Sequence, residues 1–346
     1  MDYENTATLD SGLFGFQKSY DQSDIAIIPV PWDATVSYRR GTHQGPQHIL
    51  QASTQLDFFD PETGSGALEA GIYMDPIPED LLKLNQEATD VCMKVQQILE
   101  TSDTSKGDEL SSLTHQANEL CSKMVNRAYV LAKKFSAEGK LVGLIGGDHS
   151  TPLGLIEAVG QNTSGDFGVL HIDAHHDFRD SYQGFENSHA SIMNNVMKLQ
   201  DAPKAVVQFG IRDYSKSEFE FAKNDPRIHV LYDKSLHQQL LEGKSFAEVV
   251  RPYLDKLPQN VYVSVDIDGF DPALCPDTGT PVPGGLDYNQ YLFLLDELRR
   301  QGKKLVGFDL VEVGPSTDPE NEYNGNVGAR VLYQLCRFGH LSRTSK

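Results

Sequence analysis

The chain has 346 residues, with 30 Lys and Arg against 49 Asp and Glu, so its formal net charge is −19. Hydrophobic residues make up 39% of the chain, enough for a sizeable core, which excludes a wholly disordered protein. The acidic balance argues against a nucleic-acid partner, and no stretch approaches the ~18 apolar residues of a membrane span.

Seven short apolar runs follow one another from residue 25 onward. They are Ile25–Val30, Leu141–Ile145, Phe167–Ile172, Ala205–Phe209, Ile228–Tyr232, Val261–Val265 and Leu305–Leu310. They are continuous Val, Ile and Leu runs without alternation, which is typical of strands covered on both faces. Helical segments lie between them, and Asp287 with Gln290 predicts a capping box that opens a helix over 288–300. The alternation predicts an α/β fold of three layers, α/β/α, with a mainly parallel, doubly wound sheet.

One polar stretch interrupts this alternation. Residues 101–112 contain few apolar side chains, so we expect a solvent loop between two helices. The candidate chemical residues run from His149 to Glu312, so a division into two domains would split them. We therefore expect one domain over residues 1–346, with a core of about 22–340.

Four polar clusters each follow one of the predicted strands. They are Gly146–Ser150, Asp173–Asp177, Ser264–Pro272 and Val311–Pro315. The carboxyl ends of strands are where open α/β sheets bind their ligands. Residues two and four apart in an extended chain face one side, so we expect Asp173, His175 and Asp177 to converge on one point. The same spacing brings Asp266 and Asp268 together.

The number of converging groups bears on the kind of site. With His149 there are two imidazoles and four carboxylates, which is too many for one zinc ion. Two divalent ions such as Mn²⁺, bridged by carboxylate and water, suit this set. A lone Asp-x-Asp is usually surface charge and a lone histidine is usually structural, but six such groups buried without metal would cost too much.

Together these motifs resemble the ureohydrolase superfamily of arginases and agmatinases, from about Pro29 to Gln334. The matching segments are Tyr38–Pro46, Gly147–Ser150, Asp173–Asp177, Ser264–Pro272 and Thr278–Gly285. The resemblance implies an arginase-like fold. It also implies a metal-dependent amidinohydrolase, agmatinase-like, that cleaves a guanidino C–N bond to give urea and an amine.

The resemblance assigns six metal ligands: His149, Asp173, His175, Asp177, Asp266 and Asp268. His149 and Asp177 would hold one metal and His175 the other. Asp173, Asp266 and Asp268 would complete and bridge the pair, with Asp271 as a supporting partner. The implied cofactor is two Mn²⁺, with Ni²⁺ as the alternative.

The resemblance also implies a mechanism. Metal-activated water would attack the guanidinium carbon while Glu312 holds the planar group by paired charge-assisted hydrogen bonds. His189, expected to titrate near neutrality, would pass a proton to the leaving amine, and the metal-bound Asp177 would carry the first transfer. His176 alternates with His175, so we expect it to point away from the metals and to pack.

The stretch before His189 bears on the substrate. Arginases place a Ser/Asn-rich loop there to recognise a carboxylate, whereas residues 182–187 here contain two aromatics and Glu186. This favours a small cationic guanidino substrate without a carboxylate, bound by Glu312, His189 and Glu186. Residues 79–112 look longer than in compact agmatinases, and either border the site or form a surface excursion.

Several alternatives stay open. A ureohydrolase for guanidinobutyrate, free guanidine or arginine fits the same motifs, while an inactive metal-binding paralogue is disfavoured because every implied site residue is present. The resemblance further implies a homo-oligomer, a trimer or a hexamer. The four cysteines are scattered without a Cys-x-x-Cys pair, and residues 1–12 carry no secretory signal, so we expect a cytoplasmic location.

Overall fold

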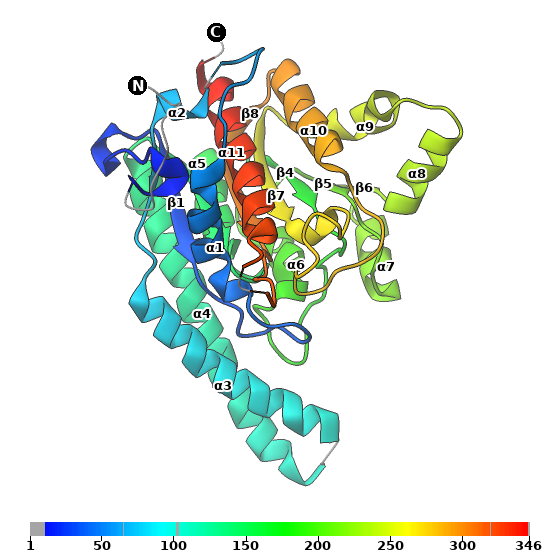
Figure 1. The fold of residues 1–346 in the computed structure, drawn as a ribbon. Helices are drawn as coiled ribbons and strands as arrows, with labels where there is room; N and C mark the ends of the chain where they lie inside the picture. Colours follow the sequence, from blue (N-terminus) through cyan, green and yellow to red (C-terminus); the bar gives the residue numbers. More distant parts are fainter. Residues whose placement is uncertain (1–10, 65, 102–103, 319, 345–346) are drawn as a thin grey trace.

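The computed structural model describes residues 11–64, 66–101, 104–318 and 320–344. In this part of the chain, eight strands form one sheet in the order β2-β1-β3-β8-β7-β4-β5-β6, and all of their pairings are parallel. The strands are β1 (Ile25–Val30), β2 (Ile72–Met74), β3 (Leu141–Gly146), β4 (Gly168–Ile172), β5 (Ala205–Phe209), β6 (Ile228–Leu231), β7 (Asn260–Asp266) and β8 (Lys304–Val311). Helices cover both faces of the sheet (Figure 1). The predicted three-layer α/β fold is confirmed.

The predicted apolar runs agree closely with the observed strands. β1 and β5 have the predicted bounds, and the other five runs differ from their strands by one residue at one or both ends. The pattern does not predict β2, because this edge strand has only three residues. So short an apolar segment cannot be told from a loop by periodicity.

Two separate cores cover the two faces of the sheet. On β1, Ile25 and Ile27 belong to one core while Ala26 and Ile28 belong to the other. The first core is covered by α1 (Gly45–Ala52), α2 (Ala67–Ala70), α8 (Asp233–Leu241), α9 (Phe246–Leu254), α10 (Tyr288–Arg300) and α11 (Tyr323–Thr344). The second is covered by α3 (Glu79–Thr101), α4 (Gly107–Ala137), α5 (Leu153–Thr163), α6 (Ile192–Met197) and α7 (Lys216–Asn224). Burial on both faces explains why the strands are apolar throughout.

The long helices α3 and α4 lie side by side and extend well beyond the sheet (Figure 1). We call this pair the helical hairpin. The prediction of a solvent loop over 101–112 is wrong for residues 107–112, which are already helical; residues 102–103 lie outside the described part. A polar sequence does not prevent a helix whose surroundings are mostly water, and Asp108 and Glu109 suit its positive N-terminal end. No helix of the described residues is both long enough and apolar enough for a membrane span.

The capping box predicted for α10 is present. Asp287 accepts a hydrogen bond from the backbone of Gln290, and the Gln290 side chain accepts one from the backbone of Asp287. This reciprocal pair satisfies donors that a helix N-terminus otherwise leaves free.

Candidate functional site

The four strands that precede the predicted polar clusters are neighbours in the sheet. β3, β8, β7 and β4 are adjacent in that order, and they are parallel. Their carboxyl ends therefore share one edge. This topology brings together clusters that are more than 160 residues apart in the chain, as shown by the hydrogen bond between the His149 backbone and Glu312, with a sequence separation of 163.

The chain leaves these strands through constrained backbone. A Cβ at Gly147 would lie 1.8 Å from the carbonyl oxygen of Trp32, so only glycine fits there. Asp177 and Glu312 have left-handed φ values of 58° and 62°, a conformation that is uncommon outside glycine and concentrated at functional sites. β4 ends at Ile172, so it is the turn at Asp177, and not strand alternation, that brings the side chains of this cluster together.

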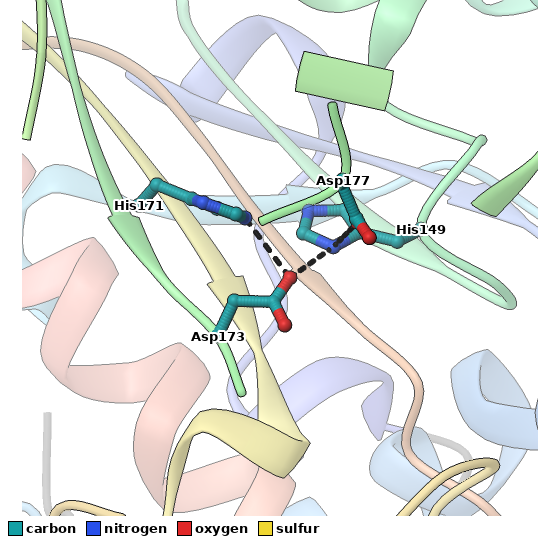
Figure 2. Close-up of side chains that lie close together, drawn as sticks. All are labelled: His149, His171, Asp173 and Asp177. Carbon is teal, nitrogen blue, oxygen red and sulfur yellow. Dashed lines mark ion pairs between the residues drawn. The ribbon is translucent and has the colours of Figure 1, made fainter. Parts of the chain in front are cut away.

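One group of potential ligands gathers around His149 (Figure 2). Its Nδ1 lies 2.9 Å from Asp173 Oδ2 and 3.2 Å from Asp177 Oδ2. An oxygen of Asp266 is 3.3 Å from the same nitrogen. A single nitrogen cannot satisfy three carboxylates, and neither His149 Nδ1 nor Asp173 Oδ2 has a hydrogen-bond partner among the described residues. Buried atoms that lie this close together without forming a hydrogen bond fit a divalent ion as their shared partner.

A second group gathers around His175. Its Nδ1 lies 3.2 Å from Asp268 Oδ2 and 3.5 Å from Asp173 Oδ1. Asp173 therefore belongs to both groups, with one oxygen turned to each. The backbone N–H of Ala174 and the hydroxyl of Thr280 both donate to Asp268 and fix its orientation. The geometry fits two ions that share Asp173.

Groups behind His149 set which of its nitrogens faces the ligands. Its Nε2 lies 2.9 Å from Ser264 Oγ, and that hydroxyl donates to Asp309 at 3.0 Å. Such outer contacts fix the tautomer and the ring orientation of metal-binding histidines. This arrangement leaves Nδ1 for the centre of the group.

His171 belongs to the first group, although the sequence analysis did not single it out. It lies on β4, fully buried, and its Nε2 is 3.0 Å from Asp173 Oδ2 (Figure 2). Its other nitrogen contacts the side chain of Gln208 on β5 at 2.8 Å. The signal was available, because His171 stands two residues before Asp173 and interrupts an apolar strand.

The carboxylates of the site have displaced pKa values. Burial, together with the charge of Asp173, raises the pKa of Asp177 to about 7. Burial and the neighbouring Asp268 and Asp173 raise the pKa of Asp266 well above its usual range. Burial also acts to raise the pKa of Asp173, but nearby His171 and His149 hold it well below its usual range. Burial thus disfavours the charged forms of Asp177 and Asp266, and a divalent cation beside them would favour those charged forms.

Beside the ligands lies a cavity of about 290 Å³ with Glu312 in its wall. The backbone N–H of His149 donates to Glu312 Oε1 at 3.0 Å, whereas Oε2 is buried without a hydrogen-bond partner among the described residues. Burial and the charges of Asp266 and Asp148 raise the pKa of Glu312 well above its usual range. A cationic partner in the cavity would therefore be strongly favoured.

We call the six predicted ligands and Glu312 the inner cluster. The structure brings all seven together: His149, Asp173, His175, Asp177, Asp266, Asp268 and Glu312. We call the cavity-lining residues beyond them the outer rim. The name covers six of them, Ser37, Arg179, Tyr182, Asp213, Tyr214 and Glu218, none of which the sequence analysis identified as a site residue; His189, Ala190, Ser215 and Thr280 also line the cavity.

His189 lines the same cavity. Its backbone N–H donates to Thr35 Oγ1 at 3.3 Å, and its Nδ1 lies 3.3 Å from the same hydroxyl. Burial, with His175 and other cationic groups nearby, lowers the pKa of His189 to about 3. The expectation that His189 titrates near neutrality is therefore wrong, because an enclosed imidazole beside cationic groups stays neutral.

Three other residues can be compared with their predicted places. Glu186 is exposed and does not line the cavity; its backbone N–H donates to Asn118 on α4. Asp271 is also exposed and accepts a hydrogen bond from its own turn, so it does not support the ligands. His176 packs as predicted: it is fully buried, with its Nδ1 2.7 Å from Gln208 Oε1.

Comparison with known proteins gives the family. The model described as "Arginase family" matches residues 23–337. The chain belongs to the arginase family. This family uses a dinuclear metal centre, and the two ligand groups provide candidate residues for one.

Individual relatives agree with this membership. An agmatinase of Bacillus cereus is 32% identical over 304 residues, covering 88% of each chain. An N(1)-aminopropylagmatine ureohydrolase of Thermus thermophilus is 30% identical over 298 residues, covering 86% of this chain and 85% of the relative. Among solved structures, proclavaminate amidino hydrolase from Streptomyces clavuligerus has the same fold, with a TM-score of 0.70, 24% identity, and coverage of 96% of this chain and 97% of the other.

Proposed function

We propose that the protein is an agmatinase-like ureohydrolase, which hydrolyses a guanidino C–N bond to give urea and an amine. The observation that carries this proposal is the pair of ligand groups sharing Asp173, placed beside the buried Glu312 Oε2, which has no hydrogen-bond partner in the described part of the chain. The names of relatives that match most of the chain, agmatinase and N(1)-aminopropylagmatine ureohydrolase, support a cationic guanidino substrate.

Two divalent ions are the proposed cofactor, and they would supply a water activated at neutral pH and stabilisation of developing charge. One ion would be held around His149 with Asp177, and the other around His175 with Asp268. Asp173 would be shared by both ions, Asp266 would complete the group around His149, and His171 would orient Asp173. The mixture of imidazole and carboxylate suits Mn²⁺, with Ni²⁺ as the alternative.

Glu312 and His189 have distinct roles in this proposal. Glu312 Oε2 accepts hydrogen bonds from the guanidinium and fixes its plane, while Oε1 is already held by the His149 backbone. Asp177 lines the cavity and takes the first proton. His189, neutral at pH 7, accepts a proton at a ring nitrogen and passes it to the leaving amine.

The outer rim bears on which guanidino compound is bound. Asp213 and Glu218 suit a substrate with an amine at its far end, as in agmatine. Arg179 lies in the same wall, with its Nη2 3.6 Å from Glu218 Oε2. This arginine favours a second candidate, a guanidino acid such as guanidinobutyrate, whose carboxylate would pair with it.

The test is urea release by protein loaded with Mn²⁺ or Ni²⁺. The substrates are agmatine, guanidinobutyrate, arginine and guanidine. We expect agmatine to give the highest kcat/KM. A preference for guanidinobutyrate would support the second candidate, and no urea from any substrate with either metal would overturn the proposed activity.

Three further expectations complete the proposal. We propose that residues 22–340 form one domain, since one sheet joins β1 to β8. A cytoplasmic location is supported by the four cysteines, which are all free and buried. A trimer or hexamer stays a prediction, for which light scattering is the direct measurement.

A further inference from the structure

The outer rim of the cavity is held by side chains of the helical hairpin. Two loops that contribute to the rim, residues 35–37 and residues 182–187, both make hydrogen bonds to it. Each of these bonds starts from a side-chain amide, that of Gln96 on α3 or that of Asn118 on α4. The hairpin is therefore more than a surface excursion.

The loop before His189 contains a strained turn. Tyr182 and Phe185 exchange two backbone hydrogen bonds, of 3.1 and 2.9 Å, and enclose Gln183 and Gly184 between them. Both enclosed residues have positive φ, 55° and 86°, as in a type I′ turn. Glycine adopts this conformation freely, whereas glutamine does so only when its surroundings stabilise it.

The hairpin provides that stabilisation. Gln96 Nε2 donates to Gln183 Oε1 at 2.9 Å. Asn118 donates to the carbonyl of Gly184 at 3.1 Å and accepts the backbone N–H of Glu186 at 3.0 Å. A Cβ at Gly184 would lie only 2.9 Å from a side-chain carbon of Thr114 on α4, so the turn packs directly against the helix.

Gln96 also holds the other loop of the rim, residues 35–37. Its Nε2 donates to the carbonyl of Val36 at 3.2 Å, next to the cavity-lining Ser37. Its Oε1 accepts from Arg40 at 3.0 Å, and Arg40 in turn donates to the carbonyls of Asp33 and Ala34. One side chain thus ties both loops to α3.

Tyr182, the first residue of this turn, lines the cavity. Its ring meets the ring of His189 edge to face, with centroids 5.7 Å apart. The guanidinium of Arg179 lies over the same ring at 5.0 Å from its centroid. The strained turn therefore sets the position of Tyr182, and Tyr182 borders both a rim cation and His189.

We propose that Gln96 and Asn118 are positioning residues for substrate specificity, which hold the Gln183–Gly184 turn and so fix Tyr182 and Arg179 around the far end of the substrate. This proposal rests on the proposed function, because it concerns the substrate that the same cavity binds. Among the described residues, neither amide hydrogen-bonds to the inner cluster, so the main effect falls on binding of the substrate's tail.

The experiment compares Gln96→Leu and Asn118→Ala with wild type, using agmatine and guanidine as probes. Agmatine has an aminobutyl tail that would extend toward the rim if Glu312 binds its guanidinium, whereas guanidine has none. We expect kcat/KM for agmatine to fall about tenfold in each variant, mainly through a higher KM, and kcat/KM for guanidine to fall much less. Gln86→Leu is the matched control on α3, because within the described residues the exposed Gln86 side chain bonds only to Asp90, so this change should alter neither parameter.

Hydrogen exchange gives a second measurement that does not need turnover. The backbone N–H groups of Tyr182 and Phe185 should exchange faster in Gln96→Leu and Asn118→Ala, with unchanged exchange in β4 and β7. Equal losses for agmatine and guanidine, the same KM change in Gln86→Leu, or unaltered exchange in the turn would overturn the proposal. If wild type released no urea at all, the proposed activity would fail, while faster exchange in the turn would still support the positioning role.

Discussion

The inner cluster and the outer rim line one cavity, but different forces place them. Each inner residue lies at or just after the end of one of four adjacent strands, so the hydrogen-bonded register of the sheet fixes it. The rim residues Ser37 and Tyr182 lie on loops whose position depends on a few amide hydrogen bonds to the helical hairpin. Each such bond contributes about 1 kcal/mol, so the rim can change more easily than the chemistry it surrounds.

The largest loss should follow a change in the inner cluster. Asp266→Asn removes a negative charge that faces His149 at 3.3 Å, so we expect metal content and urea release to fall together, with activity lower by on the order of a thousandfold. Metal analysis and a urea assay on the same sample measure both. The exposed Asp271→Asn is the matched control and should keep metal and activity; two bound metals with full activity in Asp266→Asn would remove Asp266 from the ligands.

Glu312→Gln should separate binding of the substrate from binding of metal. The amide keeps the size of the side chain but loses the charge that a guanidinium pairs with, so we expect kcat/KM to fall by about a hundredfold or more. Metal content should be unchanged. Glu87→Gln, an exposed change on α3, is the control. Unaltered kinetics in Glu312→Gln would show that Glu312 does not hold the substrate.

His189 lies between the two regions, because it lines the cavity with the inner cluster but contacts Tyr182 of the rim. His189→Gln should lower kcat by about a hundredfold through loss of proton transfer. With its pKa at about 3, His189 stays neutral from pH 5 to 8. The fall of kcat at low pH should therefore have the same midpoint in the variant as in wild type. If the variant lost the fall of kcat at low pH, His189 would be the group that titrates between pH 5 and 8.

The smallest effect concerns stability without metal. Burial raises the pKa of Asp177 to about 7 and that of Asp309 to about 6, so the folded state binds protons that the unfolded state has already released. The free energy of unfolding of chelator-treated protein should therefore fall as pH rises from about 4 to 7.

Denaturant unfolding at several pH values measures this trend, and Mn²⁺ provides the control. Bound cations favour the ionised carboxylates, so the fall with pH should be much weaker when the metal is present. A metal-free protein that became more stable between pH 5 and 7 would contradict the raised pKa values.

The inner cluster and the outer rim also differ in how well the sequence predicts them. The strands and the inner cluster can be predicted, because buried parallel strands carry continuous apolar runs and the ligands follow them within a few residues. Strand spacing alone gives the wrong reason for the convergence of Asp173 with Asp177, because the left-handed backbone at Asp177 is a property of the folded turn. The sequence also does not predict that His189 is neutral, because its pKa depends on burial and on charges from distant segments.

Of the outer rim, the sequence indicated only the loop over residues 182–187, and not the contacts that hold it. Gln96 and Gln183 are 87 residues apart, and nothing in either segment indicates that they meet. The polar residues 107–112 suggest a loop by composition, whereas the helix they begin is stabilised by packing farther along, at Leu120 and Met124. A polar composition thus predicts that a segment is exposed to water, but not whether it is a helix or a loop.

The number of divalent ions bound per chain tests the central claim most directly. The protein would be loaded with Mn²⁺, dialysed, and its metal content measured by mass spectrometry against protein concentration. Two ligand groups that share Asp173 predict two ions per chain at saturation, and one in a His175→Ala variant. A wild-type protein that saturates at a single ion, or that binds none, would contradict the account.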